Sequence, residues 1–157
     1  LNRDAFKNIN EFILKSSKHF IEEVQEINVE TFWVAQSWLN KCSKGGWQNV
    51  HAHANSVVSG VFYMKHEGNM KQPGLLFHKA DYMGAPSIIY NRHVGNSMHY
   101  AQEARFHVEQ GTLIMFPSYM AHGHEHNTSD KERVSLAFNV FAKGDFGSKE
   151  TLTELKI

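Results

Sequence analysis

Beyond Asn28, the chain is a succession of short runs rich in aromatic and β-branched residues, separated by segments rich in Gly, Asn, Pro and Ser. Such runs are typical of β-strands, and the segments between them are typical of tight turns. We expect eight strands, over residues 31–40, 49–53, 57–65, 74–79, 87–90, 104–109, 112–116 and 134–141. Eight short strands joined by tight turns predict a mainly β fold with antiparallel sheets, either a jelly roll or a barrel.

The segment before the strands carries apolar residues at helical spacing. They recur three, four and seven residues apart, at Phe6, Ile9, Ile13, Phe20, Val24 and Ile27. This spacing predicts an N-terminal amphipathic helix over about 3–27, whose apolar stripe packs against the sheet. A chain of 157 residues has the size of a single domain. We therefore expect one domain over 1–157, with a β core over about 31–141 and a peripheral tail over 142–157.

Charge and cysteine content exclude some partners and favour one compartment. Sixteen Lys and Arg residues balance sixteen Asp and Glu residues, so no net charge favours nucleic acid or an anionic membrane. The longest apolar runs, such as 113–116, are far below the roughly 20 residues that span a bilayer. The single cysteine, Cys42, cannot form an intramolecular disulfide, which favours a reducing, cytoplasmic location. The first residue is Leu1 rather than Met, which is consistent with removal of an upstream segment and any targeting signal.

Three of the eleven histidines are spaced as a metal site requires. His51 and His53 are two residues apart in a predicted strand, so both side chains point to the same face. His122 follows a later strand, at a strand end where barrels usually hold their sites. Three such ligands form a facial set that leaves positions on the metal open. The alternative is a surface pair, or a hydrogen-bonded pair of half-buried rings, at 51 and 53. We expect His124 and His126 to lie in a solvated loop.

Polar side chains share faces of two other predicted strands. Side chains two residues apart in a strand share a face. This alternation places Arg133, Ser135 and Asn139 on one face of the last strand, and Ser59 and Tyr63 on one face of an earlier strand. If these faces are interior, Arg133 must have an anion, because an unpaired buried charge is costly. A bound carboxylate is the natural partner, and the phenol of Tyr63 can share it. The alternatives are an exposed Arg133 at the strand start and a core tyrosine bonded to a backbone carbonyl.

The order of these motifs resembles a known family over roughly 37–140. The motifs are Trp38-x-Asn40, His51-x-His53, Ser59-Gly-Val-x-Tyr63, Gly74-Leu-Leu-Phe77, Gly111 to Phe116-Pro-Ser, His122, and Arg133-x-Ser-x-x-x-Asn139. Together they resemble the 2-oxoglutarate/Fe(II)-dependent oxygenases of bacteria and phages, relatives of the prolyl-4-hydroxylase-like group.

The resemblance implies a double-stranded β-helix (jelly roll) with Fe(II) as cofactor and 2-oxoglutarate as co-substrate. It implies an oxidoreductase that uses dioxygen to hydroxylate a small-molecule or peptide substrate, with release of succinate and CO2. His51 and His122 then ligate iron, and His53 stands where the family's wider pattern has an aspartate. Asp81 is an alternative source of a carboxylate.

The resemblance also implies a co-substrate site. Arg133, Ser135 and Tyr63 would anchor the distal carboxylate of 2-oxoglutarate. Ser59 and Asn139, which belong to the same motifs, complete the expected set of co-substrate-binding residues.

Two rival interpretations use the same histidines. Gly111-x5-Pro117 followed by His122 resembles a cupin motif, which suits a three-histidine cupin dioxygenase or isomerase. Such an enzyme has no use for Arg133 and Tyr63 as a carboxylate clamp, so binding of 2-oxoglutarate separates the two. A non-enzymatic metal-binding jelly roll is the other rival.

Overall fold

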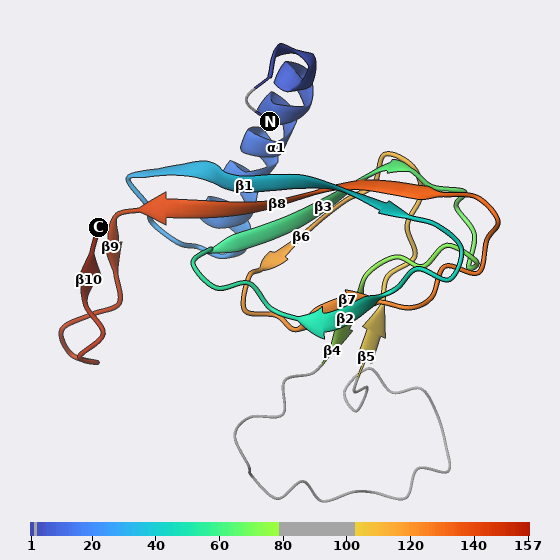
Figure 1. The fold of residues 1–157 in the computed structure, drawn as a ribbon. Helices are drawn as coiled ribbons and strands as arrows, with labels where there is room; N and C mark the ends of the chain where they lie inside the picture. Colours follow the sequence, from blue (N-terminus) through green and yellow to red (C-terminus); the bar gives the residue numbers. More distant parts are fainter. Residues whose placement is uncertain (2, 79–102) are drawn as a thin grey trace, which may run out of the picture.

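Two four-stranded antiparallel sheets form the body of the protein, described by a computed structural model for residues 1, 3–78 and 103–157 (Figure 1). The strands are β1 (Thr31–Cys42), β2 (Gln48–His51), β3 (Val58–Lys65), β4 (Leu76–His78), β5 (Glu103–Arg105), β6 (Leu113–Pro117), β7 (His122–His124) and β8 (Arg133–Lys143). One sheet, here called the long sheet, has the order β1-β8-β3-β6, and the other, the short sheet, has the order β2-β7-β4-β5. This alternation of strands between two facing sheets is a double-stranded β-helix, so the predicted jelly roll is confirmed.

The N-terminal segment is helical and packs on the long sheet, as its apolar spacing predicts. It consists of a 3-10 turn (Asp4–Phe6), α1 (Lys7–His19) and a π-helical segment (Phe20–Val24). Ile13 and Ile21 are fully buried and pack with Val58, Phe138 and Val140 of the long sheet. Figure 1 shows the helix on the side of this sheet away from the short sheet. No helix of the described residues is long and apolar enough to cross a membrane.

The strands of the short sheet differ most from the prediction. The strand expected over 49–53 ends at His51, that expected over 74–79 covers Leu76–His78, and that expected over 104–109 covers Glu103–Arg105. The strand expected over 87–90 lies outside the described residues. No strand was predicted at β7, since His122 was placed just past a strand end and His124 in a loop. The strand forms because β2 and β4 pair with it from both sides.

The last long strand extends further than predicted. β8 continues to Lys143, two residues beyond the expected strand end at 141, and Ala142 is fully buried. The remaining residues form a hairpin of β9 (Asp145–Phe146) and β10 (Leu155–Lys156). This hairpin projects away from the two sheets (Figure 1).

The register of the long sheet arranges the polar residues that face the short sheet. Ser59 lies opposite Asn139, and Tyr63 lies opposite Ser135, in the β3–β8 pair. Asn40 of β1 lies on the other side of Ser135. These side chains share the space between the sheets with an apolar cluster built from Leu75, Phe77 and Phe116, against which Val61, Ile114 and Met120 pack. The interior therefore has a polar end and an apolar layer.

Candidate metal centre and anion site

The three histidines nominated by the sequence converge between the ends of the two sheets. Each of His51, His53 and His122 offers one nitrogen, and these atoms lie within 4.8 Å of one another. His51 and His122 are register partners in the β2–β7 pair, with ring centroids 4.4 Å apart. His53 lies beyond the end of β2, so strand parity is the wrong reason for its orientation. Its position is set instead by its backbone N–H, which donates to the carbonyl of Ser118 at 2.9 Å.

Backbone carbonyls fix the tautomer of two of these imidazoles. Nδ1 of His51 lies 2.8 Å from the carbonyl oxygen of Asn49, and Nδ1 of His122 lies 2.8 Å from that of Met120. A carbonyl can only accept, so each Nδ1 carries the hydrogen and each Nε2 presents its lone pair. Metal-bound histidines typically donate a hydrogen bond in this way from the ring nitrogen that does not bind the metal.

The environment keeps His53 and His122 neutral, as metal binding requires. Burial lowers the pKa of His122 to about 4; the hydrogen bond to Met120 opposes the shift, and His51 and His53 add to it. Burial, and then the neighbouring His51, also lower the pKa of His53. Nε2 of His53 lies 3.2 Å from Nε2 of His122. Such closely spaced imidazole lone pairs suit a divalent metal such as Fe(II), so the residues present fit this cofactor.

Imidazoles supply every ligand of the metal-binding cluster that the described residues contain. Within the described ranges, no carboxylate joins the three histidines. Asp81, the alternative carboxylate considered from the sequence, lies outside the described residues. A cavity of about 30 Å³, enough for one water molecule, adjoins the cluster and is also lined by Trp38 and Asn40.

Arg133 is buried, and no acidic residue in the described part of the chain pairs with it. It is 3% exposed, which excludes the alternative of an exposed arginine at the strand start. Its Nη1 donates to the carbonyl of Pro73 at 2.6 Å, and its Cζ lies 5.7 Å from the ring centroid of Tyr63. Its Nε is buried and has no partner among residues 1, 3–78 and 103–157, where Arg133 forms no ion pair. A buried guanidinium with an unused donor is an anion site, because leaving it uncompensated is costly.

Two hydroxyl groups border this anion site. Tyr63 and Ser135 are both buried, and they face each other across the β3–β8 pair. Burial raises the pKa of Tyr63 to about 12, and the neighbouring Arg133 opposes this shift. The phenol therefore stays protonated near neutral pH and can donate a hydrogen bond. Asn40 lies beside Ser135 and also lines the histidine cavity, which brings the anion site next to the metal centre.

Ser59 and Asn139 are buried and engaged with each other. Ser59 Oγ donates to Asn139 Oδ1 at 2.8 Å and lies 2.9 Å from the hydroxyl of Ser118. Ser118 is in turn 2.5 Å from the hydroxyl of Ser56. This chain of hydrogen bonds supports the segment whose carbonyl holds the backbone of His53. Ser59 also lines the histidine cavity.

His124 was expected in a solvated loop, and this expectation is wrong. It lies in β7, two residues after His122, and is only partly exposed. Burial, and then Arg133, lower its pKa to about 4. The spacing of two between His122 and His124 is the strand period, which was the available signal. His126 is exposed, as expected, and its Nδ1 donates to the carbonyl of Gly45 at 3.0 Å.

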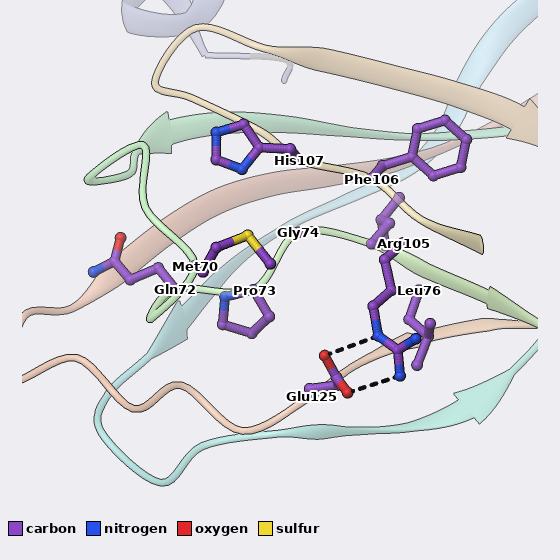
Figure 2. Close-up of a pocket in the computed structure, with 10 residues that line it drawn as sticks. Met70, Gln72, Pro73, Gly74, Leu76, Arg105, Phe106, His107 and Glu125 are labelled. Atoms are coloured by element: carbon purple, nitrogen blue, oxygen red, sulfur yellow. Dashed lines mark hydrogen bonds and ion pairs between the residues drawn. The ribbon is translucent and has the colours of Figure 1, made fainter. Parts of the chain in front are cut away.

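A second hollow lies beside Pro73 and Gly74 (Figure 2). It has a volume of about 110 Å³. Figure 2 shows Arg105 at its edge, where Nε and Nη2 donate to the carboxylate of Glu125 at 3.3 and 3.1 Å. Because this guanidinium already has a carboxylate partner, the hollow is not a second anion site of the Arg133 kind.

Comparison with known proteins agrees with this geometry. Residues 36–139, about two thirds of the 157, match the family model described as "Putative 2OG-Fe(II) oxygenase". The chain belongs to the 2OG-Fe(II) oxygenase family. The family resemblance inferred from the sequence is thereby confirmed, and with it Fe(II) and 2-oxoglutarate as the family's cofactor and co-substrate. No curated protein matches the chain.

Several solved structures share the fold. A prolyl-4-hydroxylase from Pseudomonas putida is 17% identical, with 91% of this chain and 69% of that chain covered and a TM-score of 0.59. An oxidoreductase of the 2OG-Fe(II) oxygenase family from Burkholderia pseudomallei is 16% identical, with 78% and 50% covered and a TM-score of 0.56. HygX from Streptomyces hygroscopicus, with nickel, 2-oxoglutarate and hygromycin B bound, is 8% identical, with 87% and 66% covered and a TM-score of 0.58. The chain thus spans half the length of the Burkholderia protein.

Proposed function

We propose that the protein is an Fe(II)- and 2-oxoglutarate-dependent dioxygenase that hydroxylates a small-molecule or peptide substrate with release of succinate and CO2. The observation that carries this proposal is the juxtaposition of three converging imidazoles with a buried guanidinium that has no acidic partner among the described residues. Family membership supports the same activity.

Each residue of the site has a separate task in this proposal. His51, His53 and His122 hold the iron through their Nε2 atoms. When bound, iron and 2-oxoglutarate supply the dioxygen-dependent oxidation that the protein side chains cannot perform. Arg133 holds the distal carboxylate of the co-substrate through its free donors, since a guanidinium pairs well with a carboxylate.

The hydroxyl groups complete the co-substrate site. Tyr63 and Ser135 donate to the same carboxylate, and the protonated state of Tyr63 suits it to that role. Ser59 and Asn139 shape the co-substrate side of the cavity, because their mutual hydrogen bond ties β3 to β8 beside the histidines. Burial of all five side chains keeps bulk water away from the reacting groups.

The three-histidine cupin remains the second candidate function. What favours it is the donor set, which among the described residues is all imidazole and lacks the carboxylate of a two-histidine, one-carboxylate triad. It assigns no task to Arg133, whereas the oxygenase assigns one. Binding of 2-oxoglutarate therefore discriminates between them.

An anaerobic binding experiment tests the oxygenase proposal. Addition of Fe(II) and 2-oxoglutarate to the purified protein should produce a metal-to-ligand charge-transfer absorption band. His122→Ala should abolish the band, because it removes the buried ligand. Arg133→Leu should raise the 2-oxoglutarate concentration that half-saturates the band by on the order of 100-fold, because the distal carboxylate of the co-substrate loses its buried partner.

A matched control separates this effect from a loss of positive charge. Arg105→Leu removes a surface arginine that already pairs with Glu125, and should leave the titration unchanged. A band that persists in His122→Ala would show that the ligand assignment is wrong. A succinate-release assay over panels of small molecules and peptides would then identify the substrate.

A further inference from the structure

We propose that Trp38 is a positioning residue that orients His53 toward the metal by stacking on its ring. This inference rests on the metal-binding part of the proposed function only. It divides the cluster into two ligands that are fixed by hydrogen bonds and one ligand that is fixed by aromatic contact.

The hydrogen-bond pattern distinguishes the three histidines. His51 and His122 each donate from Nδ1 to a backbone carbonyl at 2.8 Å, which sets both ring orientation and tautomer. The ring of His53 has no such anchor: in the part of the chain that the structure describes, its Nδ1 makes no hydrogen bond. His53 also lies in a loop after β2, so the pleat of a strand does not direct its side chain.

Aromatic stacking takes the place of the missing hydrogen bond. The rings of Trp38 and His53 have centroids 5.8 Å apart and planes only 20° apart. The ring of His53 is also nearly parallel to that of His122, at 5.0 Å and 11°. Offset parallel packing at these distances is one of the two favoured arrangements of aromatic rings. His53 is therefore held by two rings whose own positions are set by strands.

The long sheet places Trp38 for this task. Trp38 lies in β1 opposite Ala137 of β8, and both line the histidine cavity. The small side chain of Ala137 leaves room for the indole at the cavity wall. Partners that orient a metal ligand typically change metal affinity 10- to 100-fold when they are removed.

Titration of the metal-free protein with Co(II), without 2-oxoglutarate, tests the proposal through the visible absorption of the bound metal. Trp38→Leu keeps an apolar side chain without a ring, and should weaken Co(II) binding by about 10-fold or more. Trp38→Phe restores a ring, and should bind Co(II) within a few-fold of the wild type. Trp33→Leu is the matched control on β1, because Trp33 packs on Phe141 and not on the histidines. It should bind Co(II) as the wild type does.

A double-mutant cycle separates positioning from a general structural role. In a His53→Ala background, Trp38→Leu should cause no further loss of Co(II) affinity, because the ligand that it orients is already absent. An equal loss in both backgrounds would overturn the proposal, as would wild-type affinity in Trp38→Leu.

A measurement on the metal-free wild-type protein covers the case in which Trp38→Leu does not fold. Nuclear Overhauser contacts should join the indole protons of Trp38 to the ring protons of His53, with His53→Ala providing the assignment. Absence of these contacts would overturn the proposal. Because none of these readouts needs 2-oxoglutarate or turnover, a failed succinate assay would leave this test intact. Failure of the wild type to bind Co(II) would overturn the positioning role together with the metal centre.

Discussion

The phenol of Tyr63 is influenced by two opposing effects. Burial disfavours the phenolate and raises the pKa to about 12, whereas the positive charge of Arg133 favours the phenolate and acts in the other direction. Burial is the larger effect, so the phenol stays a hydrogen-bond donor throughout the neutral range. A donor beside a guanidinium is a suitable partner for a carboxylate ligand.

The raised pKa of Tyr63 predicts a loss of stability at high pH. An unfolded tyrosine ionises near pH 10, about two units below the folded value. Below pH 10 both states keep the proton. Between about pH 10 and 12 the unfolded state releases it first, so the free energy of unfolding falls as pH rises through this window. Urea unfolding of the metal-free wild type should therefore show a steeper decline with pH than Tyr63→Phe.

The control for this comparison is Tyr119→Phe. Tyr119 is 77% exposed, so this variant leaves the buried phenol of Tyr63 in place and should decline in parallel with the wild type. Parallel declines of the wild type and Tyr63→Phe would contradict the raised pKa.

Strand parity predicted some of the site residues and failed for others. Arg133, Ser135 and Tyr63 lie in long strands, so the alternation of their side chains could be read from the sequence. His53 reaches the cluster from a loop, and its position depends on the carbonyl of Ser118, a contact between residues 65 apart in sequence. The burial of His124 depends on strand pairing on both sides of β7, which no local pattern indicates.

Length explains which elements were predictable. β1, β3 and β8 have 12, 8 and 11 residues, and their alternating patterns gave boundaries close to those observed. β4, β5 and β7 have three residues each, too few for a pattern, and they carry charged or imidazole side chains. Their formation is decided by neighbouring strands.

Gly123, at the centre of β7, provides a test of whether pairing with β2 positions the histidines. A Cβ there would meet the carbonyl oxygen of Gln48 at 2.7 Å, and this oxygen belongs to the β2 backbone. Because backbone cannot rotate away, Gly123→Ala should separate β7 from β2 and displace His122 from His51. We expect metal affinity, measured by Co(II) titration, to fall by at least 10-fold.

Gly147→Ala, in the β9–β10 hairpin, is the matched control for this substitution. Its Cβ would meet the carbonyl oxygen of Thr153 at 2.2 Å, again a contact with backbone, in a hairpin that projects away from the two sheets (Figure 1). It should lower stability through local strain, and leave Co(II) affinity nearly unchanged. Equal effects of the two substitutions on metal affinity would contradict a specific role of the β2–β7 pair.

At the scale of the whole molecule, the long sheet separates two apolar clusters. Ile13 and Ile21 join the cluster on the helix side, whereas Phe77 and Phe116 belong to the cluster between the sheets, beside the histidines. Protein interiors are close-packed, so a void in one cluster is felt mainly by its own neighbours. The helix should therefore contribute to stability more than to the geometry of the metal centre.

Ile13→Ala tests this separation. Ile13 is fully buried against the long sheet, so the truncation should leave a cavity and cost about 2–5 kcal/mol in the free energy of unfolding. Denaturant unfolding measures this loss, and Val24→Ala, at a side chain that is 58% exposed, should change it far less. In the folded fraction, the 2-oxoglutarate concentration that half-saturates the Fe(II) charge-transfer band should stay within two- to three-fold of the wild-type value, because the β-sheet between helix and site is intact. A larger change would mean that the helix acts on the metal centre through the sheet, and that the two clusters behave as one core.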